Sequence, residues 1–411
     1  MLKQKYPITY WYNPAVMDEA ALRRMKEAGF TQVIADRSPE ENKRIIEWCR
    51  AEGLEVLVCD PRIIEAVKDS VQREKLLRDA VDEYKGCTNV YGYYIMDEPS
   101  EKAFDDLGHV REILEKLDPS KLAYVNLLPN YATLEGLGSE SYQSHLENFI
   151  KTVRPQMLSY DHYHFQERRM ALPSHEKTEG SENQTRITTA EIEERAGFFD
   201  NIETMRDISK KTGIPFMIII LTVEHGVYRN VNEAEIRWEV FQSLAYGSAK
   251  ISYFTYGLPE GLPESDESFW KYSNSIVNAD GSPTRHYYEI SRINQELQTL
   301  GSYLAGRTPQ ETCHIGREEN ACVKYYEPDG DVRDIETTAG VTLALYEKEI
   351  LLANKSFTET NRLEITVAAS KRIFVMDKTT GEWYQLNPIT GTEDRFTLTL
   401  MPGDGELIKI I

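Results

Sequence analysis

Cysteine is scarce in this chain, and its spacing does not suit disulfides or metal. Five cysteines occur in 411 residues, and no CxxC pair or Cys/His spacing typical of zinc is present. We therefore expect neither a disulfide framework nor a structural zinc site. Free thiols are typical of a reducing compartment.

Long apolar runs are also absent. No run reaches the roughly 18 apolar residues that a membrane-spanning helix needs, so we do not expect the chain to cross a membrane. The first residues, MLKQKYPITYWYNP, lack the apolar run of a signal peptide. The expected location is therefore the cytoplasm, although a secreted or periplasmic protein whose signal had been removed would look the same.

Positive charge is scarce relative to negative charge. Lys and Arg together number 47 against 67 Asp and Glu, which gives a formal net charge of -20. Such a chain repels phosphate backbones and anionic lipid surfaces, so we expect neither nucleic acid nor a membrane as partner. Tyr is abundant, with 24 residues against 13 Phe and 5 Trp. Its ring combines an apolar face with a polar tip, which suits a carbohydrate site, although packing also explains many tyrosines.

Short β-branched and aromatic runs alternate with amphipathic segments of helical period, which is typical of βα units around a parallel sheet. Eight strands are predicted, as a closed (β/α)8 TIM barrel requires, at 7–12, 32–35, 55–59, 91–96, 123–127, 157–160, 216–222 and 251–255. Eight helices are predicted at 18–28, 39–51, 71–85, 104–117, 142–153, 195–212, 233–246 and 287–304. A doubly wound sheet usually carries a GxGxxG turn after its first strand, and none is present, so the barrel is favoured.

Glycines follow several of these helices and predict left-handed C-caps, at Gly29, Gly53, Gly86 and Gly213. Beyond Gly306 the helical pattern ends, and short strands are predicted at 321–326, 342–346, 350–354, 362–367, 371–375, 382–385, 396–400 and after Gly405. We therefore expect a barrel over 1–306 and an antiparallel β-sandwich over 307–411. Two polar stretches, 166–189 with His175 and 257–266, are interpreted as mobile insertions or as lids over a substrate.

The end of the fourth strand, YGYYIMDEPS, holds the first candidate for catalysis. In a TIM barrel the active site lies at the C-terminal ends of the strands, where Asp97 and Glu98 stand here. Two adjacent acids repel each other and raise at least one pKa, which suits a proton donor near neutral pH. Capping of the following helix is the alternative role for both.

The seventh strand, PFMIIILTVEHG, ends in Glu224 and His225 after an apolar run. Strands four and seven lie on opposite sides of a barrel mouth, so Glu98 and Glu224 are expected to face each other across a sugar. Retaining hydrolysis needs carboxyls about 5 to 5.5 Å apart, and inverting hydrolysis needs about 6.5 to 9.5 Å.

Strand six, MLSYDHYHF, adds a dense cluster of polar side chains that includes Asp161. A His/Asp cluster can bind a metal, but the ligand pattern does not recur on another strand, so no metal or cofactor is expected. We expect the neighbouring polar and aromatic residues to bind substrate: Trp11, Tyr12, Arg37, Asn126, His162, Tyr163, His225 and Tyr256. Core packing is the alternative for Trp11.

These motifs resemble those of the clan A glycoside hydrolases, above all the β-galactosidase-like barrels and bacterial relatives with DEP on strand four and a C-terminal β-domain. The resemblance spans the barrel. It implies that Glu98 is the acid/base and Glu224 the nucleophile, with Tyr163 or His162 holding the nucleophile. Clan members usually carry Asn where Asp97 stands, and often Trp where Tyr256 stands.

The resulting hypothesis is a glycoside hydrolase that cleaves a β-linked oligosaccharide by retaining double displacement. An inverting enzyme with Asp161 or Asp97 as base is a second interpretation, and a carbohydrate-binding barrel without catalysis is a third. A metal-dependent isomerase or lyase is a further barrel option. The sequence leaves a homo-oligomer open.

Overall fold

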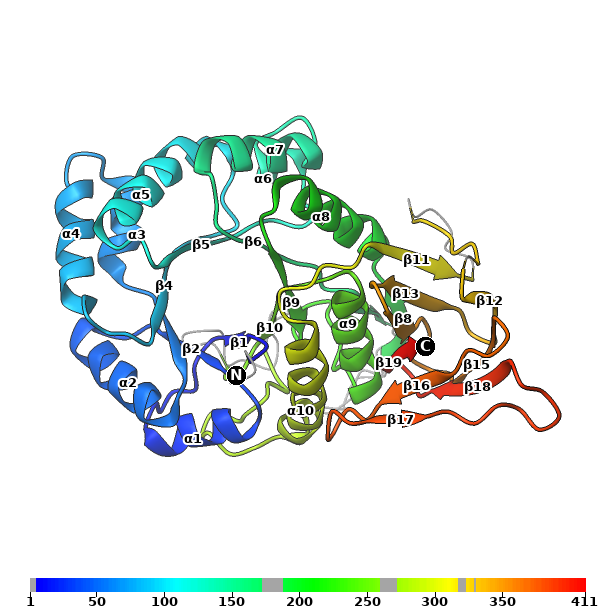
Figure 1. The fold of residues 1–411 in the computed structure, drawn as a ribbon. Coiled ribbons are helices and arrows are strands. Elements are labelled where there is room, and N and C mark those ends of the chain that lie inside the picture. The colour runs from blue at the N-terminus through cyan, green and yellow to red at the C-terminus, as the bar shows by residue number, and fades with distance from the viewer. Residues whose placement is uncertain (1–4, 172–187, 259–271, 317–322, 329) are drawn as a thin grey trace, which may run out of the picture.

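The computed structural model describes residues 5–171, 188–258, 272–316, 323–328 and 330–411. The first three hundred residues alternate strands and helices around two parallel four-stranded sheets (Figure 1). One sheet has the order β2–β3–β4–β5, with β2 Gln32–Ala35, β3 Glu55–Val58, β4 Val90–Asp97 and β5 Leu122–Asn126. The other has the order β1–β10–β9–β6, with β1 Ile8–Trp11, β10 Lys250–Phe254, β9 Phe216–Leu221 and β6 Leu158–Asp161.

The two sheets meet at both edges. Leu127, just after β5, forms a parallel bridge to Tyr160 of β6. At the other edge Thr31, just before β2, donates its amide N–H to the carbonyl oxygen of Ile8, at 3.0 Å. All eight predicted parallel strands are therefore present, each within two residues of its predicted bounds.

Helices lie outside the strands, as Figure 1 shows. They are α1 Glu19–Glu27, α2 Pro39–Glu52, α3 Pro61–Lys68, α4 Arg73–Tyr84, α5 Phe104–Leu117, α6 Leu134–Leu137, α7 Tyr142–Val153, α8 Phe198–Thr212, α9 Glu233–Ala245 and α10 Arg285–Leu304, with a 3-10 turn at Glu101–Ala103. Local sequence sets their limits: Ser38 and Glu41 form a capping box at α2, and Gly53 ends that helix with φ 71°. Gly29, Gly86 and Gly213 also have positive φ, as predicted.

The C-terminal part is a separate antiparallel β-domain. One sheet has the order β11–β13–β14–β19–β16–β17, with β11 Glu311–Ile315, β13 Val341–Leu345, β14 Glu349–Asn354, β19 Gly405–Ile410, β16 Ile373–Met376 and β17 Trp383–Gln385. The second has the order β12–β15–β18, with β12 Val332–Thr337, β15 Asn361–Val367 and β18 Arg395–Leu400. Both sheets contribute to one hydrophobic cluster, which includes Leu343, Ile365 and Phe396.

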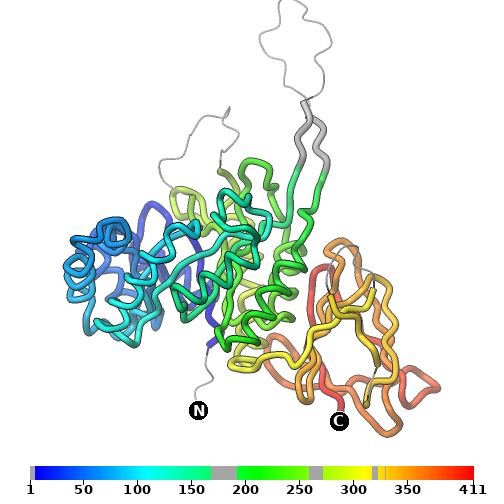
Figure 2. The backbone as a smooth tube through the Cα atoms, turned by 90° about the horizontal axis from the view of Figure 1, so that it is seen from above, coloured from blue at the N-terminus to red at the C-terminus, as the bar shows by residue number. Residues whose placement is uncertain are grey.

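This β-domain packs beside the part of the N-terminal region that holds β6, β9 and β10 (Figure 2). Gln242 and Trp238 of α9 donate to the carbonyl oxygens of Asn354, at the end of β14, and of Lys355, just after it. Gly403 lies so close to α9 that a Cβ there would stand 1.9 Å from the carbonyl oxygen of Ala234. Only glycine fits this close approach.

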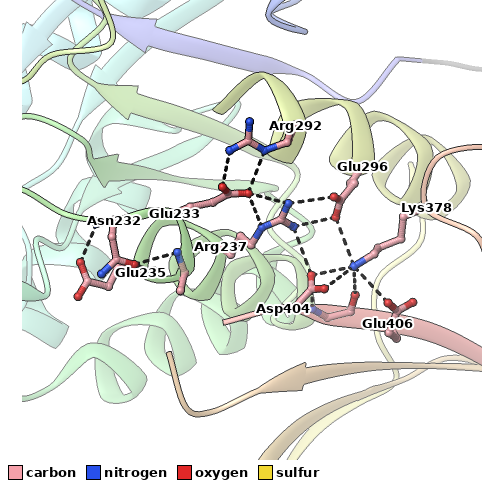
Figure 3. Close-up of polar contacts among 11 residues, drawn as sticks. Asn232, Glu233, Glu235, Arg237, Arg292, Glu296, Lys378, Asp404 and Glu406 are labelled. Carbon is pink, nitrogen blue, oxygen red and sulfur yellow. Dashed lines mark hydrogen bonds and ion pairs between the residues drawn. The ribbon is translucent and has the colours of Figure 1, made fainter. Parts of the chain in front are cut away.

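A cluster of charged side chains crosses the same contact (Figure 3). Arg237 of α9 pairs with Glu296 of α10 at 2.8 Å and with Asp404 of the β-domain at 3.4 Å. Lys378, between β16 and β17, lies 2.7 Å from Asp404, 3.2 Å from Glu406 and 3.3 Å from Glu296. Two cations therefore hold carboxylates of both regions in a poorly hydrated contact.

Several features bear on the sequence expectations. The stretch 166–189, interpreted as a mobile insertion or a lid, overlaps β7 Phe165–Ala171 and β8 Thr188–Glu194, which pair in an antiparallel hairpin that was not predicted. His175 and most of 257–266 lie outside the described residues. Helices α3 and α6 and strands β11 and β12 were not predicted. Within 323–328 the expected strand forms one isolated bridge, between Tyr325 and His314.

Four cysteines are described, and all four are free thiols: Cys49, Cys59, Cys87 and Cys313. No helix among the residues described is both long enough and apolar enough to cross a membrane.

Replacement of Lys378 tests the charged contact. The Lys378→Met variant should lose about 2 to 3 kcal/mol of unfolding free energy, because three part-buried carboxylates lose a common cation. Lys371→Met is the matched control: it breaks the surface pair with Asp331 in the same domain and should cost less than about 1 kcal/mol. Urea unfolding measures both, and equal losses would contradict a special role for Lys378.

Candidate functional site

Three acids meet where β4, β5 and β6 end. Asp97 is the last residue of β4 and pairs in register with Asn126, the last residue of β5. The Asn126 amide donates to Asp97 Oδ1 at 3.0 Å and to Asp161 Oδ1, at the end of β6, at 3.1 Å. Ser159 donates to Asn126 Oδ1 at 2.8 Å, which fixes the orientation of the amide. Asn126 thus holds the carboxyls of two neighbouring strands together.

Glu98 joins this group through an unusual backbone conformation. Adjacent residues of a strand point to opposite faces, but Glu98 has φ 45°, a left-handed conformation that few residues with a Cβ adopt. Its amide N–H donates to the carbonyl oxygen of Asn126 at 2.9 Å, which ties this turn to β5. The Glu98 carboxyl is hydrogen-bonded to that of Asp161, so the two groups share a proton.

The electrostatics of the three acids favour protonated carboxyls. Burial and the neighbouring Asp97 charge raise the pKa of Glu98 to about 7, although the hydrogen bond with Asp161 opposes the rise. Burial raises the pKa of Asp161 well above its usual range, and the charges of Glu98 and Asp97 add to this effect. Burial also raises the pKa of Asp97, although the Asn126 hydrogen bond opposes the rise. One group of this set therefore titrates near neutral pH.

The three acids differ in access. Asp161 is buried, with 5% of its surface exposed. Asp97 and Glu98 are accessible to solvent even though many protein atoms surround their carboxyls. The carboxyls of Asp97 and Glu98 are therefore poorly hydrated and still within reach of a ligand.

Tyrosine hydroxyls surround the acids. Burial is the largest cause of the raised pKa of Tyr163, Tyr94 and Tyr12, and the charges of the acids add to it. All three acids contribute at Tyr163, Asp97 and Glu98 contribute at Tyr94, and Asp97 contributes at Tyr12. Burial and the charge of Asp161 likewise raise the pKa of Tyr131. These phenols are neutral donors and acceptors next to the carboxyls, as a site for a polyhydroxylated ligand requires.

Aromatic rings continue from Tyr163 toward the loops after β9 and β10. The Tyr163 ring lies 5.4 Å from that of Phe254 and 5.2 Å from that of Tyr228. His225 stacks on Tyr272, with centroids 4.4 Å apart and the planes 7° from parallel. Burial lowers the pKa of His225 to about 4, so its ring is neutral at physiological pH.

The structure brings Glu98, Asp97, Asp161, Asn126 and Tyr163 together. Tyr12 lies at the same edge of the fold, with 42% of its surface exposed.

Four other predicted residues take different positions. Trp11 packs edge-on against Tyr94, at 5.9 Å, and is half-buried. Arg37 donates to Asp36 and to the carbonyl oxygen of Pro14. His162 is fully buried, is hydrogen-bonded to Asn201, and has a pKa lowered to about 3 by burial.

Tyr256 requires a correction. It was expected to form the floor of a sugar site, but only 1% of its surface is exposed. Its ring lies 4.9 Å from that of Tyr10 and 5.5 Å from that of Phe30, within the main hydrophobic core. The reason is that Tyr256 follows the end of β10 and turns back toward α1, so its ring offers no face to a ligand.

Glu224 lies beyond the end of β9 and is half-buried. Its backbone forms an antiparallel bridge with Ser273, and its carboxylate accepts from Asn274 at 2.7 Å and from Ser273 at 3.2 Å. The neighbouring charge that raises the pKa of Glu98 is that of Asp97. The role of Glu224 as second carboxylate stays a prediction.

Tyr94, Tyr131, Arg195 and Tyr272 were not singled out from the sequence. Tyr94 stands on β4 three residues before Asp97, and the β-bulge between Tyr94 and Met96 changes the side-chain alternation there. Arg195 was placed at the start of a helix, whereas α8 begins only at Phe198, after Gly197 with φ 86°. Gly197 was the feature of the sequence that could have indicated the later start of α8.

Among the residues that the structure describes, no group of three or more His, Cys, Asp or Glu side chains is placed to hold a metal ion. The carboxyls of the site are instead bonded to one another and to Asn126.

No family model matches the chain, and no curated protein matches it in sequence. Its structure is similar to a β-galactosidase from the psychrophilic Marinomonas ef1, with 10% identity and a TM-score of 0.49, over 72% of this chain and 60% of that one. It is also similar to a glucosidase from Croceicoccus marinus, with 12% identity and a TM-score of 0.47, over 100% of this chain and 96% of that one. A third similar structure is a GH39 enzyme from Xanthomonas axonopodis pv. citri, with 10% identity and a TM-score of 0.48, over 99% of this chain and 94% of that one.

All three are named as glycoside hydrolases, the class that the sequence motifs resemble. Similarity at these identities and TM-scores does not determine activity, which depends on the side chains of the site.

The buried acid pair predicts how stability depends on pH. The folded pKa of Asp161 lies above its unfolded value, so the folded state binds more protons and loses stability as pH rises. In Asp161→Asn the amide can still accept from Asn126 and can donate to Glu98. This variant should therefore gain stability over the wild type, and the gain should be larger at pH 8 than at pH 5.

Denaturant unfolding at the two pH values measures this difference. Glu115→Gln, which removes an exposed acid from α5, is the control and should change stability by no more than about 0.5 kcal/mol at either pH. An Asp161→Asn effect of the same size at both pH values would show that the buried carboxyl is not responsible.

Proposed function

We propose that the protein is a glycoside hydrolase that cleaves the β-linked bond of an oligosaccharide at the ends of β4, β5 and β6. The observation that supports this most is the Glu98–Asp161 carboxyl pair, in which Glu98 has a pKa of about 7 and is accessible to solvent. As the scaffold we propose a closed (β/α)8 barrel over 1–306 with a β-sandwich over 307–411. The edge contacts between the two parallel sheets support closure.

Glu98 acts as the general acid in this proposal. A carboxyl with a pKa near 7 is protonated in a large fraction of molecules at neutral pH and can transfer its proton to the leaving oxygen. Asp161 keeps a proton next to Glu98, and Asn126 holds Asp161 in place. Turnover should therefore decline above about pH 7, with an apparent pKa that belongs to the pair.

The second carboxylate is better assigned to Glu224 than to Asp161. Two carboxyls joined by a hydrogen bond leave no room for a sugar or a water molecule between them, whereas retaining enzymes hold their carboxyls about 5 to 5.5 Å apart. In this proposal Glu224 faces Glu98 across the bound sugar; in support, its neighbour His225 lies 6.2 Å, ring to ring, from Tyr163. The Asn274 and Ser273 donors keep the Glu224 carboxylate in one orientation.

The first test is Glu98→Gln, because an amide cannot protonate a leaving oxygen. Turnover of natural oligosaccharides should fall by at least about 100-fold, within the range that general acid catalysis contributes. Glycosylation of the enzyme by an activated aryl glycoside should persist, since that leaving group needs little acid assistance. Stopped-flow and steady-state assays on both substrate types measure the difference.

Glu101→Gln is the matched control, because Glu101 lies three residues further on and bonds to Ser139 and Asn148 outside the acid group. It should retain activity. An equal loss on natural and activated substrates in Glu98→Gln would count against the acid role.

The second test concerns Glu224. Glu224→Gly removes the nucleophile, and azide or formate should restore turnover of an activated substrate by attacking the anomeric carbon from the same face. The expected product with azide is a glycosyl azide of inverted configuration, which proton NMR identifies. Near wild-type activity in Glu224→Gly, or the absence of rescue in an inactive variant, would instead favour an inverting mechanism with another base, such as Asp97.

A further inference from the structure

Arg195 is held firmly at the edge of the acid site. Its backbone N–H donates to the carbonyl oxygen of His164 at 2.7 Å, and its own carbonyl oxygen lies 2.9 Å from His164 Nδ1. The guanidinium lies over the ring of Tyr131, 3.8 Å from the centroid, and Nε donates to the carbonyl oxygen of Tyr163 at 3.2 Å. Backbone and side chain are therefore both fixed.

The partners of this guanidinium are all neutral. Nη2 donates to the hydroxyl of Tyr228 at 3.2 Å, and the amide oxygen of Gln166 accepts from Nε and Nη2 in the amide orientation that satisfies both residues. Within the described ranges, no carboxylate forms an ion pair with Arg195, and these hydrogen bonds use the Nε and Nη2 edge. The Nη1 edge is left for a ligand. In a chain with 67 acids and 47 bases, a half-buried arginine held by neutral acceptors is unusual.

Arg195 lies one aromatic ring away from the acids. The Tyr131 ring under the guanidinium carries a hydroxyl on which both Asp161 and Arg195 act electrostatically. That hydroxyl accepts from the backbone N–H of Tyr163 at 3.4 Å, and Tyr163 is the residue on which all three acids act. In a pyranose, C5 and the anomeric carbon are both bonded to the ring oxygen, so an acid at the glycosidic oxygen and a cation about one ring away can contact the same sugar, the cation through the substituent at C5.

We propose that Arg195 binds the carboxylate of a hexuronic acid, so that the glycoside cleaved at Glu98 is a uronide. This inference rests on the proposed function and adds the substrate class to it. A planar guanidinium with a free edge matches the geometry of a carboxylate, and its cation–π contact with Tyr131 keeps that edge in place.

Repulsion between the substrate carboxylate and the three acids is the main opposing effect. It is limited because the acids retain protons: the Glu98–Asp161 pair shares one, and both pKa values are raised. The negative charge of the Asp97 carboxylate is partly compensated by the hydrogen bond that Asn126 donates to it. A uronide should therefore lose binding more steeply above pH 7 than a neutral glycoside does.

A purely structural role for Arg195 makes a different prediction. If the guanidinium only joined Tyr131, Tyr163 and Tyr228, its removal would affect charged and neutral sugars alike. The test must therefore compare matched sugars that differ only at C6.

The experiment uses the full chain with methyl β-D-glucuronide and methyl β-D-glucoside in calorimetric titrations, and with the two corresponding 4-methylumbelliferyl glycosides in assays. The wild type should prefer the uronide in both. Arg195→Gln should weaken uronide binding and kcat/KM by about tenfold to 100-fold, the range for a lost charged hydrogen bond, and change the glucoside values by less than about threefold. Arg195→Lys should recover part of the preference, because it keeps the charge without the planar fork.

Arg78→Gln, which removes an exposed arginine from α4, controls for the change in net charge and should leave the preference intact. Equal affinity of the wild type for the two sugars, or an unchanged preference in Arg195→Gln with an unchanged melting temperature, would overturn the inference. Binding is measured without turnover, so loss of the uronide preference is separable from failure of the proposed hydrolysis, which the Glu98→Gln assay reports.

Discussion

The two hydrogen bonds that the Asn126 amide donates to Asp97 and Asp161 are the interaction on which the candidate site depends. Strands β4 and β6, on either side of β5, end in Asp97 and Asp161, and Glu98 follows Asp97; the three acids would repel one another if all were ionised. A single amide at the end of the middle strand donates to both flanking acids, and Ser159 fixes which way it points. Protonation of the carboxyls removes the remaining negative charge. A carboxyl that keeps its proton near neutral pH is what general acid catalysis needs.

The backbone at Glu98 completes this arrangement. A regular strand would point Asp97 and Glu98 in opposite directions, so two adjacent acids could not both take part. The left-handed conformation at Glu98, tied by its N–H to the carbonyl oxygen of Asn126, allows both to do so. Pro99 directly afterward has no N–H to continue the ladder. The same β5 residue thus positions Asp97 through its side chain and Glu98 through its backbone.

Much of this could be predicted from the sequence, for physical reasons that differ between elements. The strands were predictable because buried parallel strands read as short apolar runs, of which β9, FMIIIL, is the clearest example. Glu98 was predictable because an acid at a strand end has few structural roles. The contact between Glu98 and Asp161 was not predictable, since it depends on one φ angle and on the register of β4, β5 and β6. The position of Tyr256 was mispredicted because proximity to a strand end does not fix which way a ring turns.

Two groups of poorly hydrated carboxyls among the described residues are neutralised in different ways. At the contact between α9, α10 and the β-domain, Arg237 and Lys378 lower the pKa of Glu296 against the effect of burial, whereas burial raises the pKa of Glu406 there to about 7. At the ends of β4 and β6, Glu98 and Asp161 face each other, and their pKa values rise. A carboxyl matched by cations, as Glu296 is, stays ionised over the physiological range, whereas one that keeps a proton can release and regain it. At the ends of β4 and β6 the raised pKa belongs to Glu98, a residue exposed to solvent and therefore within reach of a ligand, which makes this group the one suited to chemistry.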